Sequence, residues 1–293
     1  MSRKLRSLML AGTGSDVGKS LVTTALCRIL KEDGYHPAPF KAQNMAPYYY
    51  TTERGEMISI AQAIQASAAG VTPIAEMNPV LMMPSSVVDS KVICLGKDLG
   101  QYHARDYFRE TEGKALLRKA AWEAYDRLSQ QYNPIVLEGA GSVTELNLLD
   151  TDFVNMPMAA YANAAVLLIA DIERGGVFAS VYGSIMLQKP QHRRLIKGVI
   201  INKFRGDIEL FEEARQMILD LTGVPVLGVI PYLKGVDLPS EDTLSDKGTH
   251  KVAYDPTDLP EYEEAYHLLA KHFRQHLDME RLYQILTEND TEA

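Results

Sequence analysis

Cysteine, positive charge and long apolar runs are scarce in this sequence of 293 residues, and each scarcity excludes a class of protein. Its two cysteines, Cys27 and Cys94, stand outside any metal-type spacing, which argues against a disulfide scaffold and favours a cytoplasmic location. The formal charge of −8 argues against a general nucleic-acid binder, because such binding needs basic residues that neutralise phosphates. No apolar run approaches the roughly 18 residues of a membrane span, so we expect no membrane partner.

The sequence does contain a series of short apolar runs, most of them followed by a helical pattern of apolar residues. The runs are at residues 5–11, 36–40, 135–137, 165–170, 199–201 and 226–230. Helices are predicted over residues 18–33, 114–131, 176–187 and 208–222. Runs that are apolar throughout are typical of strands buried on both faces, as in a parallel sheet covered by helices. The pattern predicts an α/β fold with a doubly wound, mostly parallel sheet.

Three segments differ from this alternation. Residues 41–110 are polar, and a loop region that long in a compact domain is usually functional. We expect them, with the loops after residues 138 and 171, to wall a substrate cleft within a main domain of residues 1–240. Residues 241–260 resemble a linker, and residues 261–293 a helical tail that begins with one or two amphipathic helices.

A phosphate-binding loop is predicted where the first strand meets the first helix. Residues 12–20 read GTGSDVGKS, a variant in which Thr13 stands where the common pattern has glycine. Backbone N–H groups of such a loop cradle phosphate at the helix N-terminus. Lys19 would contact the β- and γ-phosphates of ATP, and the Ser20 hydroxyl would bind Mg²⁺. The predicted nucleotide contacts are Thr13, Gly14, Ser15, Asp16, Val17, Gly18, Lys19 and Ser20.

Polar residues end the later strands, at the sheet edge where ligands bind in doubly wound folds. Glu138 follows an apolar run and is the predicted second Mg²⁺ ligand, and Asp171 is a candidate catalytic carboxylate. Arg174 could bind phosphate or a substrate carboxylate through its fork of donors. Asn202 and Lys203 are predicted to hold the nucleotide base, because an amide both donates to and accepts from a ring edge. Four carboxylates remain unranked as a third metal ligand: Asp16, Glu53, Glu56 and Asp89.

Taken together, these motifs resemble the synthetase domain of the cobyric acid synthase family, within the dethiobiotin synthetase-like P-loop proteins. The matching segments, in order, are AGTGSDVGKS, PFKAQNM, AQAIQA, MNPVLMMP, LEGAGS, DIERGGVFAS, INKFRGD and TGVPVLGVIPYL. The resemblance covers roughly residues 5–245. It implies ATP-dependent amidation of peripheral carboxylates of a cobyrinic acid diamide corrinoid, through acyl phosphates and with Mg²⁺.

The resemblance also implies roles for polar residues in the first half of the chain. Lys41 would help to neutralise the incoming carboxylate, which completes a catalytic set of Lys19, Lys41, Glu138 and Asp171. Gln43, Asn44, Gln62, Gln65 and Asn78 would contact the amide-rimmed substrate.

The sequence departs from this family at its C-terminal side. A glutamine-hydrolysing domain needs a cysteine nucleophile on a sharp turn, and neither cysteine has that setting. We therefore expect no glutaminase domain in this sequence, with ammonia coming from solution or from a separate glutaminase subunit. The tail could be a packing appendage, or it could form a homodimer.

Three other functions remain open at this point. A ligase of the dethiobiotin synthetase type shares the variant loop and the acyl-phosphate chemistry, but its substrate would be a small diamino acid. A nucleotide switch of the partition type usually carries an additional lysine early in the loop, which residues 12–17 lack. A binding protein without turnover is disfavoured by the presence of Lys19, Ser20 and Glu138.

Overall fold

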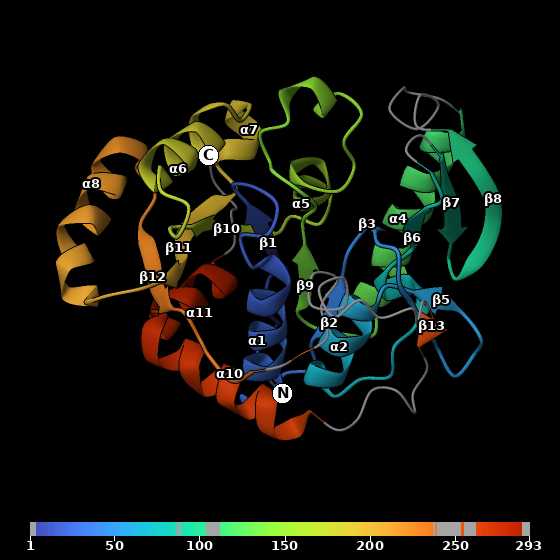
Figure 1. The fold of residues 1–293 in the computed structure, drawn as a ribbon, viewed down its shortest axis with the longest axis horizontal. Coiled ribbons are helices and arrows are strands. Elements are labelled where there is room, and N and C mark those ends of the chain that lie inside the picture. Colours follow the sequence, from blue (N-terminus) through green and yellow to red (C-terminus); the bar gives the residue numbers. More distant parts are fainter. Residues whose placement is uncertain are drawn as a thin grey trace.

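A six-stranded sheet of parallel strands forms the centre of the computed structural model (Figure 1). The model describes residues 4–86, 89–103, 112–236, 238, 253–254 and 262–288. The strands run in the order β12-β11-β10-β1-β9-β2. Their bounds are Leu8–Gly12 for β1, Ala38–Phe40 for β2, Ile135–Glu138 for β9, Ala165–Asp171 for β10, Ile196–Phe204 for β11 and Val226–Pro231 for β12. Every residue of β1, β9 and β10 is buried, as expected of strands covered on both faces.

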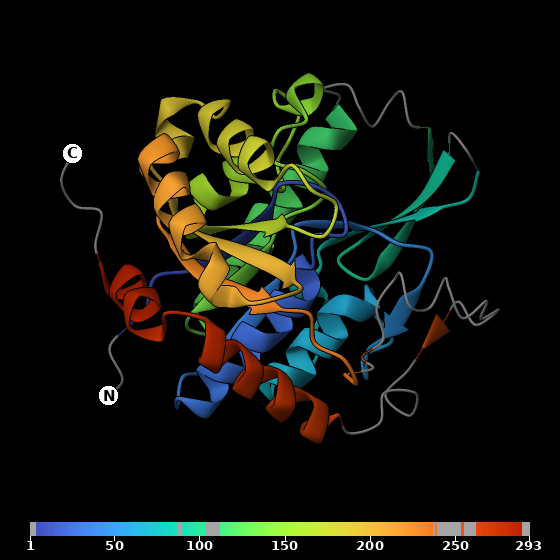
Figure 2. The same ribbon diagram turned by 60° about the vertical axis from the view of Figure 1, so that its left-hand side comes forward.

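Helices cover both faces of this sheet, as Figure 2 shows. On one face lie α1 (Lys19–Glu32), α2 (Ile60–Ala69), α10 (Glu263–His276) and α11 (Met279–Thr287). On the other face lie α4 (Glu112–Ser129), α5 (Met156–Tyr161), α6 (Val177–Met186), α7 (Pro190–Arg193) and α8 (Glu212–Thr222). The predicted doubly wound parallel fold is therefore confirmed. A short 3-10 helix, η3 (Ile208–Phe211), takes up the first turn of the helix predicted at 208–222.

Neighbouring strands in this sheet set the place of a ligand site. The chain passes from β1 to β2 on one side and later to β10 on the other, so that β9 and β10 flank β1. Ligands of open parallel sheets bind at the carboxyl ends of the strands where the order switches. The loop after β1 and the ends of β9 and β10 meet at this point.

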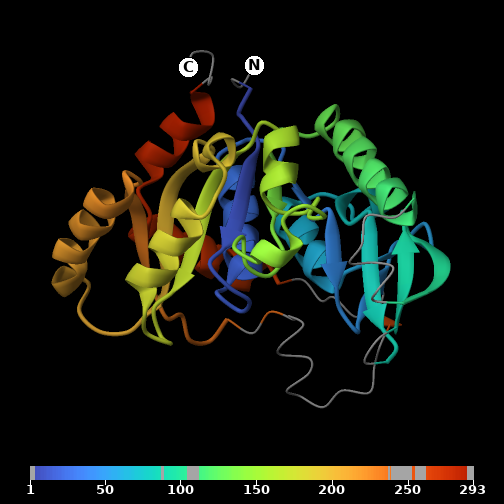
Figure 3. The ribbon, with the colours of Figure 1, turned by 90° about the horizontal axis from the view of Figure 1, so that it is seen from above.

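The expectation that residues 41–110 form a long loop is wrong. They contain a four-stranded sheet, in the order β3-β6-β7-β8, that lies beyond β2 at the end of the molecule opposite α8 (Figure 3). Its strands are Gln43–Met45 (β3), Val80–Pro84 (β6), Asp89–Cys94 (β7) and Lys97–His103 (β8), and a 3-10 helix, η1 (Ala75–Met77), precedes β6. The polar residues of β8 are mostly exposed, which explains why the segment reads as a loop in sequence.

Part of the predicted linker is structured as well. Ala253–Tyr254 forms a short strand, β13, that pairs with β4 (Tyr49–Thr51), which in turn pairs with β5 (Met57–Ile58). The remainder of residues 241–260 lies outside the described residues.

The predicted helical tail forms two helices, α10 and α11, within residues 262–288, and its other residues lie outside the described part of the chain. Arg274 of α10 bonds to Asp33 at 2.7 Å and to the Ile29 carbonyl at 3.2 Å, and so ties the tail to the end of α1. Tyr266 and Phe273 are buried in the main core, so α10 packs as a structural layer of the sheet.

Candidate active site

The loop between β1 and α1 has the conformation of a phosphate cradle. Gly18 has φ +94°, a conformation that side chains with a Cβ rarely adopt, and Asp16 shares the left-handed region with φ 56°. A Cβ at Gly12 would lie 2.8 Å from the Lys19 Nζ, so glycine there permits the close approach of the lysine. The variant loop therefore places Lys19 and the N-terminus of α1 as a phosphate site requires.

Lys19 is buried within this cradle. Its Nζ donates to the carbonyl oxygens of Gly14 and Gly141, each at 2.9 Å. Burial, together with the nearby Lys41 ammonium, lowers the pKa of Lys19 to about 8, against the opposing attraction of Glu138. Both of these hydrogen-bond partners are neutral, so a bound phosphate would give the Lys19 ammonium an anionic partner.

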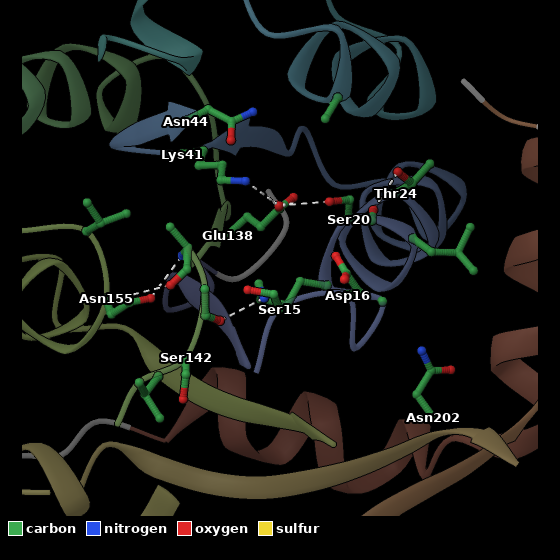
Figure 4. Close-up of a pocket in the computed structure, with 18 of the residues that line it drawn as sticks. Ser15, Asp16, Ser20, Thr24, Lys41, Asn44, Glu138, Ser142, Asn155 and Asn202 are labelled. Carbon is green, nitrogen blue, oxygen red and sulfur yellow. Dashed lines mark hydrogen bonds and ion pairs between the residues drawn. The ribbon is translucent and has the colours of Figure 1, made fainter. Parts of the chain in front are cut away.

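Glu138, at the end of β9, is the centre of a buried polar network (Figure 4). Its Oε1 accepts hydrogen bonds from Ser20 Oγ at 2.9 Å and from Lys41 Nζ at 2.8 Å. Its Oε2 accepts from Gln65 Nε2 at 2.5 Å, and Gln65 Oε1 in turn lies 3.4 Å from Gln62 Nε2. These groups come from α1, α2, β9 and the loop after β2, so the fold itself brings them together.

The pKa of Glu138 lies below its usual range. Burial alone would raise this pKa, but the Lys41 charge and the hydrogen bonds from Lys41, Gln65 and Ser20 outweigh burial and hold the carboxylate ionised. Ser20 and Glu138 thus present a hydroxyl and a carboxylate oxygen side by side, which is the donor set that Mg²⁺ prefers. The two residues fit the predicted metal role.

Of the four unranked carboxylates, Asp16 alone lines the cavity beside these residues. Glu56 instead accepts from Thr52 and from the backbone of Ala75. Among the described residues, no three His, Cys, Asp or Glu side chains cluster in a way that could hold a metal. Water and phosphate oxygens would complete the coordination, as is usual for Mg²⁺ at phosphate sites.

Asn202 and Lys203, at the end of β11, reach back to the phosphate loop. Asn202 is buried, and its Nδ2 donates to the carbonyl of Val17 at 2.9 Å. Lys203 Nζ donates to the Asp16 carbonyl at 2.5 Å and to Asp171 Oδ2 at 3.1 Å. Asp171 does not line the cavity, so its observed part is to hold Lys203 in place.

The predicted substrate contacts fall into two groups. Gln43 and Asn44 line the cavity, and the Gln43 Oε1 is buried without a hydrogen-bond partner. Gln62, Gln65 and Asn78 are buried and do not line the cavity.

The amides of this second group bond to protein groups. Asn78 Nδ2 donates to the carbonyls of Lys41 and Val80, each at 3.1 Å, while Gln62 and Gln65 extend the network around Glu138. A substrate contact for these three has no support from the geometry. Arg174, whose side chain is 70% exposed, lies 3.7 Å from Asp16 Oδ2 and does not line the cavity.

The cavity itself has a volume of about 950 Å³ and continues well beyond the phosphate loop. This is near the upper end of the roughly 300–1,000 Å³ typical of small-molecule sites. Its lining includes Asn202, Tyr232 and His272 as well as Met45, Lys114 and Phe153. Figure 4 shows Asn202 on the side of the cavity away from Lys41 and Asn44. A cavity of this extent has room for a second ligand beside a nucleotide.

Comparison with known proteins also assigns most of the chain to a nucleotide-binding domain. Residues 8–244 match the model of the family described as CbiA, the CobQ/CobB/MinD/ParA nucleotide binding domain. The chain belongs to this family. The cobyric acid synthase of Phocaeicola vulgatus is 59% identical over 244 residues, which are 83% of this chain and 49% of that protein. The probable cobyric acid synthase of Methanosphaerula palustris is 51% identical over 239 residues, 82% of this chain and 48% of that protein.

The chain thus spans about half the length of the curated relatives it matches. A solved structure of the receptor FtsY from Elizabethkingia anophelis in complex with GDP aligns with a TM-score of 0.47. It is 15% identical and covers 79% of this chain and 59% of that one, a similarity too low to indicate a shared function. No helix in the described part of the chain is long and apolar enough to cross a membrane.

Several lining residues of this family member are absent from the motifs read in the sequence. Lys114 is a buried lysine at the start of α4, and its positive charge acts to lower the pKa of the nearby Asp152, which burial raises. Asn155 donates to and accepts from the backbone of Ala140, and a Cβ at Gly139 would meet its Oδ1 at 2.5 Å. Gly139 of the LEGAGS motif indicated in the sequence that another group approaches closely. The sequence did not reveal that this group is the Asn155 side chain.

Proposed function

We propose that this chain uses ATP to amidate peripheral carboxylates of a cobyrinic acid a,c-diamide corrinoid, giving cobyric acid in cobalamin biosynthesis. The observation that supports this most is the convergence of Ser20 and Lys41 on Glu138, next to the buried Lys19 of the phosphate loop, in the wall of a large cavity. Cobyric acid synthases at 51–59% identity share this half of their chain with it.

The proposed reaction has two steps that balance in atoms and charge. A substrate carboxylate oxygen attacks the γ-phosphorus of ATP, the bond from that phosphorus to the β–γ bridging oxygen breaks, and ADP leaves. Ammonia then attacks the acyl carbon, the bond from that carbon to the phosphate oxygen breaks, and phosphate leaves as the nitrogen loses a proton. Catalysis in such transfers is mostly positioning and charge neutralisation.

The residues at the phosphate end fit these tasks. Lys19 would bind the β- and γ-phosphates, where its proton is stabilised by their charge. Lys41, held on Glu138 at 2.8 Å, would face the incoming carboxylate. Ser20 and Glu138 would hold Mg²⁺, which when bound neutralises charge on the transferring phosphoryl group. Gln43, with its buried and unpartnered Oε1, would accept a hydrogen bond from a substrate amide.

The nitrogen donor in this proposal is ammonia, supplied from solution or by a separate glutaminase subunit. Neither cysteine suits the nucleophilic role that glutamine hydrolysis requires. Cys27 is fully buried in α1, and burial raises the pKa of its thiol far above neutrality. Burial also raises the pKa of Cys94, at the end of β7.

The test is ATP turnover with Mg²⁺ and a cobyrinic acid a,c-diamide, with ammonium and glutamine supplied in separate reactions. We expect ADP release that depends on the corrinoid, and a product mass that changes by one amide per ADP with ammonium. A parallel reaction with a small diamino acid tests the dethiobiotin-type alternative. ATP binding without corrinoid-dependent turnover under either nitrogen source would overturn the proposal.

A further inference from the structure

The end of the cavity away from Glu138 is lined by two parts of the chain that are distant in sequence. One part is the segment at the end of β12, at residues 230–233, beside Asn202. The other is α10, which contributes His272 and Phe273. The family match ends at residue 244, so α10 belongs to the part of the chain that the match does not cover.

Several contacts fix α10 in this position. Arg28 of α1 bonds to Glu263 at the start of α10 at 2.7 Å, and Arg274 bonds to Asp33 at 2.7 Å. The turn after α10 pairs with the outer strand of the sheet: Asp278 N donates to the Leu227 carbonyl at 2.8 Å. Helix α10 is therefore tied both to the helix that begins at the phosphate loop and to β12.

His272 connects α10 directly to the end of β12. Its Nε2 lies 2.9 Å from the Pro231 carbonyl oxygen. Because a carbonyl only accepts, this ring nitrogen must carry the proton and donate. Burial and the neighbouring His276 lower the pKa of His272, while the Pro231 hydrogen bond acts in the opposite direction. The lowered pKa favours a neutral imidazole ring with an apolar face. Phe273, beside it, is fully buried and apolar.

We propose that α10 completes the nucleobase compartment of the site, with His272 lining it and holding the segment at Pro231 against the base. This rests on the proposed binding of ATP by the phosphate loop. With its triphosphate in that loop, ATP would have its base beyond Lys203, near Asn202. Ile230, Leu233 and Phe273 line this part of the cavity together with the polar Asn202 and His272. A mostly apolar compartment with a few polar groups suits a purine ring. The C-terminal helix thus contributes to ATP affinity without contacting the phosphates.

The test compares ATP with inorganic tripolyphosphate, which carries a similar charge but no base, using the full chain and no corrinoid. His272→Ala should raise the Kd for ATP about fivefold, through a lost hydrogen bond and lost contact with the base. The Kd for tripolyphosphate should not change. His272→Gln keeps an N–H donor and should restore most of the ATP affinity. Gln275→Ala, an exposed position on the same helix, is the matched control and should behave as wild type.

Each other outcome is decisive. An unchanged ATP affinity in His272→Ala would exclude α10 from the compartment. An equal loss for ATP and tripolyphosphate would show that His272 only supports the fold, which a melting temperature below that of Gln275→Ala would report independently. If the wild-type protein bound neither compound, the phosphate-loop assignment itself would fail, and the proposed function with it.

Discussion

The two ends of the cavity are built from different chemistry. At the phosphate end, buried charged side chains bond to one another, as Lys41 and Glu138 do at 2.8 Å. At the end beside Asn202, the lining consists mainly of apolar side chains such as Leu233, with the Asn202 amide and the His272 imidazole among them. Opposite charges in a buried site are costly to separate and respond strongly to a new charge. In the proposed reaction, the first end would organise the chemistry and the second end would add affinity for ATP.

The largest effect is expected at Lys19, whose substitution tests most directly whether this end of the cavity carries out the proposed reaction. Lys19→Ala should lower ATP-dependent turnover at least about 100-fold, because a preorganised charge on the transferring phosphoryl group is lost. Circular dichroism should show an intact fold. The measurement is ADP release, with Lys31→Ala, on the same helix but far from the cavity, as the control. Turnover that survived in Lys19→Ala would show that the loop does not have the assigned role.

A second effect concerns stability at the same end. Glu138→Ala should lower the free energy of unfolding by about 3–5 kcal/mol, because it leaves the buried Lys41 ammonium without its carboxylate. Urea denaturation without nucleotide measures the change. Glu76→Ala, which breaks a pair with Arg127 at the surface, should cost less than about 1 kcal/mol. Similar losses of unfolding free energy in both variants would contradict a special contribution of the buried Lys41–Glu138 pair to stability.

A smaller effect sharpens the comparison within the network. Gln65→Ala removes the amide that fixes Glu138 Oε2, and should raise the Mg²⁺ concentration for half-maximal turnover about tenfold, by loosening a metal ligand. Gln62→Ala, whose amide reaches Gln65 but not the carboxylate, should cause a smaller shift. A Mg²⁺ titration at saturating ATP separates the two variants. Equal Mg²⁺ dependence in wild type and Gln65→Ala would contradict the positioning role.

The smallest effect is a pH dependence at Lys19. Since its pKa in the free protein is about 8, kcat/KM for ATP should fall as pH rises through 8, where the ammonium loses its proton. The value of kcat should decline only at higher pH, because bound phosphate favours the charged lysine. In Lys19→Arg, whose side chain stays charged, any remaining activity should lack this decline.

The same lowered pKa fixes the sign of a stability effect. Between pH 8 and 10.5 the unfolded chain holds a proton on Lys19 that the folded chain has lost. The unfolded state therefore binds more protons in this window, and the Lys19 contribution to the free energy of unfolding rises with pH. A fall in the wild-type value relative to Lys19→Arg over this window would contradict the assignment.

The main sheet was predictable from sequence because its signals are local. Each central strand is a short run of apolar residues, and the helix predicted at 18–33 is observed at Lys19–Glu32. Glycines with positive φ, such as Gly18, mark the phosphate loop for the same reason. The strand predicted at 199–201 proved longer, as β11 spans Ile196–Phe204, because its polar end still pairs with β10 and β12.

The second sheet and the distal walls of the cavity were not predictable in this way. Strand β3 has three residues and pairs with β6, far along the chain, so no local periodicity reveals it. Lys114 and His272 occupy ordinary helical positions, and only the folded chain brings them to the cavity. Gln65 was predicted to contact substrate, and its hydrogen bond to the Glu138 carboxylate depends on a tertiary contact that the sequence does not reveal.

The turn after α10 has a consequence for the behaviour of the protein in solution. Strand β12 is the outermost strand of the main sheet, and an open edge of this kind is a template for pairing with another chain. Leu277 forms a bridge with Gly228 there, and a Cβ at Gly228 would meet the His276 carbonyl at 2.7 Å. The tail thus covers part of the outer strand as well as one end of the cavity. We expect a chain cut before α10 to expose this edge and to self-associate more readily than the full chain.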